Sequence, residues 1–205
     1  VEAVGSAVKG FKAGDRVMAA APGGYAEYIA ADEHRATRIP ANNMTYEQAA
    51  CLPFAGVTAW SALQTLGQLQ AGDHVLVIGT GGVALFALQI AAASGAKPIV
   101  LSSSDDKIER AKALGAIAGL NYRTHPEWPE PVRKLTGGAG VQHVIELGGV
   151  GTLKKSVASL GLGGHLAARQ ERHRRRAAPD HEKGRRGTAI VRAGGLDTAT
   201  AVDRR

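Results

Sequence analysis

The chain has 205 residues, 44% of them hydrophobic, and a formal net charge of +7. This length is enough to bury a hydrophobic core in one or two domains. No apolar run reaches the ~20 residues of a membrane span, and the first residues lack the layout of a signal peptide. The single cysteine, Cys51, excludes an internal disulfide and a cysteine-built zinc site, so we expect a cytoplasmic protein without membrane contact.

Residues 1–45 form the first predicted unit and are rich in β-type patterns. Apolar residues are punctuated by glycines, with a turn at Gly14, and the partly alternating residues 25–29 predict a half-buried strand that contains Tyr25. The segment is too short for an independent barrel. We therefore expect it to be the end of a β domain that begins before the first residue.

Residues 46–168 alternate between helical and strand-like segments. Thr45 and Gln48 form a capping box that opens a short helix, Pro53 is expected to interrupt it, and helical spacing resumes at residues 56–66. Strands are predicted at residues 75–78, 99–101, 119–122, 141–147 and from 163, with helices at 83–93, 107–114, 130–135 and 153–160. This order predicts an α/β fold with a right-handedly wound parallel sheet and ligands at the carboxyl ends of its strands.

A glycine turn joins the first buried strand to an apolar helix. Gly79, Gly81 and Ala84 fit the pattern of a dinucleotide-binding turn, in which small residues let a diphosphate approach the backbone. The free N–H groups of Gly82 and Val83 would then face the phosphates at the positive end of the helix. The alternative is an ordinary strand-to-helix turn without a ligand.

Residues 169–205 lose the apolar pattern and hold eleven Lys or Arg against five Asp or Glu. We expect this basic tail to be disordered. One interpretation is nucleic-acid binding through Arg172 and residues 174–176 with strong salt dependence. We disfavour it because the tail has no aromatic residue for base stacking. The other interpretation is out-of-frame translation after residue 168, which would leave the sheet incomplete and the chain an inactive fragment.

Several strings occur in a family order: GDRV at 14–17, GGYAEY at 23–28, LPFAGVTAW at 52–60, SSSDDKIERAKALGA at 102–116 and LNYR at 120–123. With the glycine turn they resemble the medium-chain dehydrogenase/reductase superfamily, closest to its zinc-free quinone oxidoreductase-like and alcohol dehydrogenase-like members. The resemblance implies a Rossmann-type domain at 46–168 and the remnant of a GroES-like substrate domain at 1–45.

The same resemblance implies hydride transfer between NAD(P)H and a small carbonyl, quinone or enone substrate. Phe54 stands where zinc-dependent relatives carry a catalytic cysteine, so the expected reaction is metal-free. A homodimer is expected for full-length members but not for this chain, and the proton donor would lie before the first residue. No catalytic residue is assigned.

The end of the second strand decides the expected cofactor. NAD-preferring folds place an acid there for the ribose, whereas this chain has Ser102. The hydroxyls of Ser102 and Ser103 and the charge of Lys107 suit a 2′-phosphate, and Tyr122 resembles the superfamily's tyrosine near the adenosine phosphate. We therefore expect NADP(H) rather than NAD(H). Alternatively, the serines only cap a helix, and the acids at 105–106 would repel a phosphate.

Four further positions carry weaker expectations. Thr58 resembles the superfamily's threonine beside the nicotinamide, or is simply packed in a helix. Gly148 follows the fourth strand, where backbone can approach the nicotinamide ribose, or marks a plain turn. Cys51 is expected to be a small buried hydrophobe, and Glu146 to accept hydrogen bonds from backbone rather than to titrate. The seven histidines lack metal-site spacing and are expected to be structural or exposed.

Overall fold

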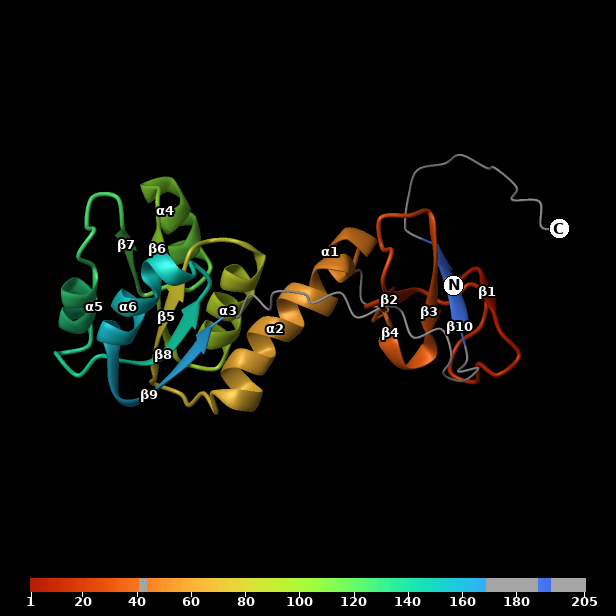
Figure 1. Ribbon diagram of the computed structural model, residues 1–205, viewed down its shortest axis with the longest axis horizontal. Helices are drawn as coiled ribbons and strands as arrows, with labels where there is room; N and C mark the ends of the chain where they lie inside the picture. The colour runs from red at the N-terminus through yellow and green to blue at the C-terminus, as the bar shows by residue number, and fades with distance from the viewer. Residues whose placement is uncertain (41–43, 169–187, 193–205) are drawn as a thin grey trace. The chain divides into compact units, whose positions relative to one another are not determined.

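The computed structural model describes residues 1–40, 44–168 and 188–192 (Figure 1). The described residues divide into two compact units: residues 1–40 and 44–53 with 188–192, and residues 54–168. In the first unit the first helix, α1 (Tyr46–Cys51), contacts β2 (Val17–Ala19). The guanidinium of Arg16 lies 4.6 Å from the centre of the Tyr46 ring and holds that helix to the first unit. Among the described residues, no helix has both the length and the apolarity that crossing a bilayer requires.

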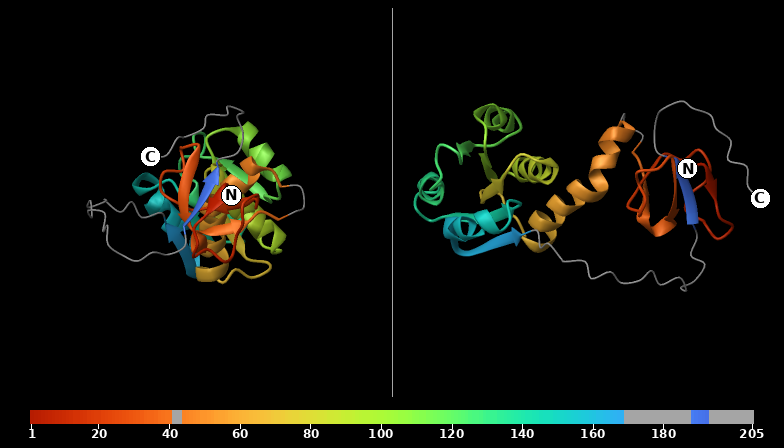
Figure 2. Two further views of the ribbon diagram at one scale, coloured as in Figure 1. Left: turned by 90° about the vertical axis from the view of Figure 1, so that its right-hand side faces the viewer. Right: turned by 45° about the horizontal axis from the view of Figure 1, so that its top comes forward.

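The first unit is built from short antiparallel strands (Figure 2). One sheet has the order β1-β10-β3 and the other pairs β2 with β4; the bounds are β1 (Ala3–Val4), β3 (Tyr28–Asp32), the 3₁₀ turn η1 (Glu33–Arg35), β4 (Ala36–Arg38) and β10 (Thr188–Arg192). The predicted strand thus begins three residues late, and Tyr25 is fully exposed rather than half-buried. β10, blue in Figure 1, was not expected, since its segment shows no sustained apolar pattern. The remaining residues of the basic tail, including 172–176, lie outside the described residues.

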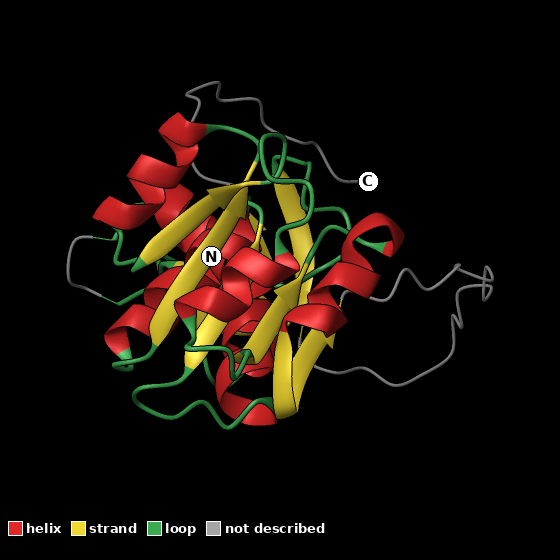
Figure 3. Ribbon diagram, turned by 90° about the vertical axis from the view of Figure 1, so that its left-hand side faces the viewer, coloured by secondary structure: helices red, strands yellow, loops and turns green. Residues whose placement is uncertain are grey.

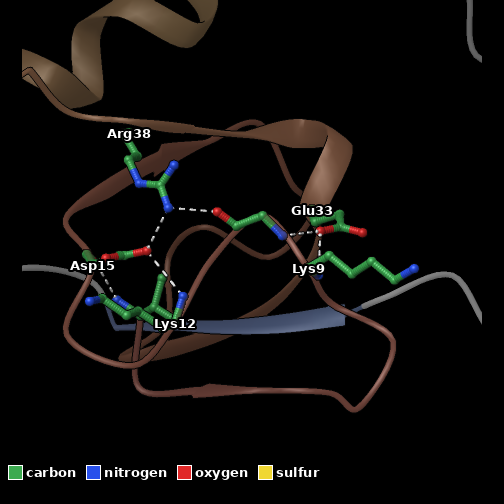
Figure 4. Close-up of polar contacts among 7 residues, drawn as sticks. Lys9, Lys12, Asp15, Glu33 and Arg38 are labelled. Atoms are coloured by element: carbon green, nitrogen blue, oxygen red, sulfur yellow. Dashed lines mark hydrogen bonds and ion pairs between the residues drawn. The ribbon is translucent and has the colours of Figure 1, made fainter.

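Charged side chains brace the loop between β1 and β2 (Figure 4). The Arg38 guanidinium donates to the carbonyl of Gly10 at 2.7 Å and to Asp15 at 3.2 Å. The Glu33 carboxylate accepts from the backbone N–H groups of Lys9 and Gly10. These charges satisfy backbone groups of an exposed loop, so their role is structural.

The second unit contains a five-stranded parallel sheet of order β7-β6-β5-β8-β9 (Figure 3). The strands are β5 (His74–Ile78), β6 (Lys97–Ser102), β7 (Ala118–Asn121), β8 (Val141–Glu146) and β9 (Leu160–Ala168). All neighbours pair in parallel. The expected Rossmann-type α/β fold is confirmed, and the fifth strand, β9, continues through Ala168.

Helices cover both faces of this sheet (Figure 3). On one face, α3 (Gly82–Ala93) and α4 (Asp105–Ala113) pack against Val77 and Val100. On the other face, α5 (Pro129–Leu135) packs against Leu76 and Leu101 through Val132, and α6 (Val150–Ser159) lies beside α5. Because side chains alternate along each strand, both faces bury apolar residues, which explains the continuous apolar runs of β5 and β6.

The helical segment before β5 runs from α1 through η2 (Leu52–Gly56), α2 (Val57–Trp60) and η3 (Ser61–Leu66). The capping box of Thr45 and Gln48 is confirmed by both reciprocal hydrogen bonds. The expected interruption at Pro53 is confirmed for the α-helix, which ends at Cys51 and resumes at Val57. Between them Pro53 lies in the wide π-type turns of η2, which give its ring more room against the preceding carbonyl groups than α-helical turns would.

Gly140 is expected to tolerate alanine far worse than Gly138. Both have a positive φ, of 85° and 91°, so alanine costs each about 1–2 kcal/mol of backbone strain. At Gly140 the added Cβ would also lie 2.6 Å from the backbone nitrogen of Gly161, whereas at Gly138 it meets nothing within 4 Å. Urea unfolding should therefore show a loss of about 2–4 kcal/mol for Gly140→Ala but only about 1–2 kcal/mol for Gly138→Ala. Equal losses would contradict this packing argument.

Candidate functional site

One cleft of about 880 Å³ lies within the second unit, at the carboxyl ends of β5, β8 and β9. Its lining comes from the helical segment and from the facing sheet: Phe54, Val57, Thr58, Ser61, Ala62, Leu66, Ile78, Gly79, Gly81, Gly82, Val83, Ile145, Leu147 and residues 165–168. The strand order reverses between β5 and β8. Open parallel sheets bind ligands at such a switch point, so this cleft is the candidate site.

The glycine turn after β5 is open toward the cleft. Gly79 has a φ of +91°, and a Cβ built on Gly79 or Gly81 would meet nothing within 4 Å. Gly81 is the N-cap of α3, and no side chain in the described part of the chain caps this end. The N–H of Gly79 is already donated to the carbonyl of Leu101 at 2.7 Å, so the N–H groups of Gly82 and Val83 remain to receive an anion at the positive helix end.

The helical segment forms the opposite wall and runs along the sheet. Ala55 lies near Gly82 at one end, and Gly67, just after η3, lies near the ring of His143 at the other. Most lining side chains from this wall are apolar, including the exposed Phe54 and Leu66. The cleft is therefore an apolar space in which a few hydroxyl and imidazole groups can orient a ligand.

The end of β6 lies next to the glycine turn, and the end of β7 lies next to that of β6. Tyr122 donates its backbone N–H to the carbonyl of Ser102 at 3.0 Å, so the structure brings these two residues together. The Ser102 side chain is buried, Ser103 is half-buried, and Lys107 is exposed on α4. Asp105 is also exposed, and its carboxylate accepts a hydrogen bond from the Asn121 side chain. None of these residues lines the cleft itself.

Glu146 organises the turn that follows β8. Its carboxylate is buried and accepts the N–H groups of Gly148 at 2.6 Å and Gly149 at 3.0 Å, the Thr152 hydroxyl at 2.7 Å and the Ser156 hydroxyl. The expectation that backbone donors satisfy Glu146 is confirmed. The carboxylate thereby fixes the chain just after Leu147, which lines the cleft.

A family described as zinc-binding dehydrogenase matches residues 82–169 of this chain. A zinc-type alcohol dehydrogenase-like protein of Schizosaccharomyces pombe is 40% identical over 191 residues, which cover 82% of this chain and 55% of that protein. The chain thus spans about half the length of the curated relatives that it matches.

The solved structures similar to the chain include the following two. The quinone oxidoreductase of Thermus thermophilus, solved also as a complex with NADPH, has a TM-score of 0.67 and 30% identity, covering 76% of this chain and 50% of that one. An NAD-dependent alcohol dehydrogenase has a TM-score of 0.62 and 39% identity, covering 66% of this chain and 39% of that one.

This chain belongs to the medium-chain dehydrogenase/reductase superfamily.

Five of the ten cofactor-binding residues expected from the sequence line the cleft. These are Thr58, Gly79, Gly81, Gly82 and Val83. Ser102, Ser103, Lys107 and Tyr122 lie outside the lining, at the ends of β6 and β7 and on α4. Gly148 lies outside the lining. A Cβ at this position would collide with the Thr152 side chain, so packing alone explains why glycine stands here. The cofactor roles of all ten stay predictions.

Other lining residues were missed from the sequence. Ser61 and Leu66 follow Thr58 on the helical segment, and a check of its helical spacing could have included them. His165 was expected to be structural or exposed, yet it lines the cleft. Cys51 is exposed, so the expectation of a buried hydrophobe is wrong; its thiol donates to the carbonyl of Glu47 at 3.4 Å. The described residues contain no group of three or more His, Cys, Asp or Glu that could hold a metal ion.

Mild acid is expected to destabilise the second unit. Burial, followed by the charge of Lys97, lowers the pKa of His74, and burial, followed by His143, lowers the pKa of His165. The unfolded chain therefore takes up protons first as the pH falls below the ordinary 6.5, so stability is lost on going down through this range. Urea unfolding between pH 7.5 and 5.5 should show this loss. His165→Gln should reduce the slope, whereas His34→Gln, at an exposed position, should leave it unchanged.

Proposed function

We propose that this chain binds a nicotinamide dinucleotide in the cleft and is the cofactor-binding part of an oxidoreductase acting on a carbonyl, quinone or enone. The observation that carries this proposal is the open, uncapped glycine turn at a switch point of the sheet. The two similar structures, one solved with NADPH and one named as NAD-dependent, support this cofactor class. Because the chain spans about half of its relatives, hydride transfer by the whole protein is part of the proposal.

The residues present fit such a cofactor. The N–H groups of Gly82 and Val83 would hold the diphosphate, and Gly81 leaves the space it needs. Thr58 and Gly148 would lie toward the nicotinamide end. The bound cofactor supplies the hydride, while the chain positions the reactants and keeps water out with Phe54 and its apolar neighbours. In this proposal, orientation and hydrogen bonds replace a metal ion.

We also propose a preference for NADP(H) over NAD(H). Ser102, not a carboxylate, ends β6; Ser103 follows it, Tyr122 donates its backbone N–H to it, and Lys107 lies on the next helix, α4. The exposed carboxylate of Asp105 opposes this preference, since it would repel a 2′-phosphate or accept a ribose hydroxyl instead. The balance between Lys107 and Asp105 therefore decides which cofactor binds more tightly.

Lys107→Ala is expected to weaken NADPH binding about tenfold, because a charge-assisted contact to phosphate contributes roughly 1.5–3 kcal/mol. NADH binding should change less than twofold. Lys112→Ala, on the same helix but paired with Glu109, is the matched control and should leave both affinities unchanged. Parallel losses for NADPH and NADH would remove the proposed preference.

Isothermal titration of the purified chain with NADPH and NADH tests the central proposal. We expect micromolar binding of NADPH and weaker binding of NADH. Absence of binding for both cofactors at millimolar concentration would overturn the proposed function. Tighter binding of NADH would overturn the preference only.

A further inference from the structure

A partly buried polar cluster lies on one face of the sheet, next to the cleft. It consists of Asp73, directly before β5, His143 on β8 and His165 on β9. His143 is 5% exposed, and its Nε2 lies 3.0 Å from Oδ2 of Asp73. A carboxylate only accepts hydrogen bonds, so Nε2 of His143 carries the hydrogen and its Nδ1 is an acceptor in the neutral ring. Asp73 thereby fixes the orientation of the His143 ring.

His165 is held against this ordered ring. The two residues are register partners on β8 and β9, and their rings meet edge to face, with centroids 5.9 Å apart. The Nδ1 atoms of both rings are buried and have no hydrogen-bond partner in the described part of the chain. A buried N–H without an acceptor is rarer and more costly than an unpaired acceptor. The buried, unpartnered Nδ1 of His165 is therefore the acceptor, and the hydrogen of the neutral ring lies on Nε2.

His165 also lines the cleft, at its far end from the glycine turn. In the register of the sheet, His165 pairs with His143, which pairs with Val75. Val75 lies three residues before Ile78, the last residue of β5, so His165 is roughly 10 Å along the strands from the end of β5. Leu66 and Leu166 line the same cleft. The cleft therefore has an anion-binding end at Gly81 and an apolar end with an imidazole N–H donor. Burial and His143 lower the pKa of His165, so this donor is uncharged at neutral pH.

We propose that His165 determines substrate specificity by donating an Nε2–H hydrogen bond to a neutral oxygen of a flat apolar substrate. This inference rests on the proposed function. It favours molecules with a second oxygen remote from the reacting carbon, above all 1,4-quinones, whose two carbonyls lie on opposite sides of the ring. An apolar molecule without such an oxygen covers this N–H donor, leaves it unpaired and binds more weakly. A carboxylate gains little, because the imidazole is neutral.

Calorimetric titration of the whole chain with a matched pair of probes tests this role. The probes are 2,3-dimethyl-1,4-naphthoquinone and 2,3-dimethylnaphthalene, which differ only in the two carbonyls; the methyl groups prevent addition of the exposed Cys51 thiol. We expect the chain to bind the quinone about 3–10-fold more tightly, the range of one hydrogen bond. His165→Leu should bring this ratio close to one. His165→Gln, which keeps an N–H donor, should retain part of it.

NADPH titration of the same variants separates this inference from the proposed function. Both variants should bind NADPH as the unmodified chain does, because His165 lies away from the glycine turn. Normal NADPH binding with a probe ratio unchanged in His165→Leu would overturn the role of His165 alone, as would failure of the quinone to bind the unmodified chain. Should His165→Leu not fold, the ¹⁵N shifts of His165 in the unmodified chain decide: a hydrogen on Nε2 and a shift on adding the quinone support the proposal, and their absence overturns it.

Discussion

Gly81→Val is expected to raise the Kd for NADPH at least about 100-fold while the fold remains intact. Gly81 has an ordinary φ of −80°, and its Cβ position is open space, so valine fits the folded chain. The same branched side chain would occupy the space through which a diphosphate reaches the N–H groups of Gly82 and Val83. Loss of two or more charge-assisted hydrogen bonds of roughly 1.5–3 kcal/mol each gives this factor.

Gly151→Val is the matched control for this change. Gly151 also has no atom within 4 Å of its Cβ position, but it lies in α6, away from the cleft. Calorimetry should show unchanged NADPH affinity for Gly151→Val, and urea unfolding should show no loss of stability for Gly81→Val. Retained NADPH affinity in a folded Gly81→Val chain would mean that the turn does not hold the diphosphate.

The fold of residues 74–168 could be predicted because its signals are local. Both faces of the sheet are covered, so β5 and β6 appear as unbroken apolar runs, and glycines end the helices between them. Pro53 shows the limit of this reasoning: its local preference predicts the interruption of the α-helix, but not the π-type turns that carry the chain through it. The exposure of Cys51 and the pairing of β10 with β1 and β3 depend on tertiary contacts, which no local pattern contains.

The residues of the candidate site also differ in whether the sequence alone predicts them. The glycine turn is recognisable from its spacing, so Gly79 and Gly81 could be proposed as site residues before the fold was known. His165 could not, because its position in the cleft depends on the register of β9 against β8 and on the helical wall opposite. Its unpaired Nδ1 is visible only once burial is known. Spacing motifs therefore locate the glycine-turn end of the cleft, whereas the polar group at its other end emerges only from three-dimensional packing.

Glu146→Ala is expected to lower the free energy of unfolding by about 4–6 kcal/mol, as measured by urea unfolding. The substitution leaves the N–H groups of Gly148 and Gly149 and the hydroxyls of Thr152 and Ser156 without their common acceptor in a buried site. Each buried donor that loses its partner costs roughly 1–3 kcal/mol, and part of this cost is relieved because Thr152 can donate to the carbonyl of Gly149.

Glu146→Gln separates the loss of the acceptor from the loss of volume. Its amide keeps one oxygen for the turn but directs an NH₂ group at a hydroxyl, so a loss of about 2–3 kcal/mol is expected. Glu130→Gln, at a carboxylate that is 77% exposed and paired only with Lys134, should change stability by less than about 0.5 kcal/mol. Because the Glu146 carboxylate fixes the turn after Leu147, Glu146→Gln should also weaken NADPH binding. Full stability with weakened binding would contradict the structural role, since the turn would then be held by other contacts.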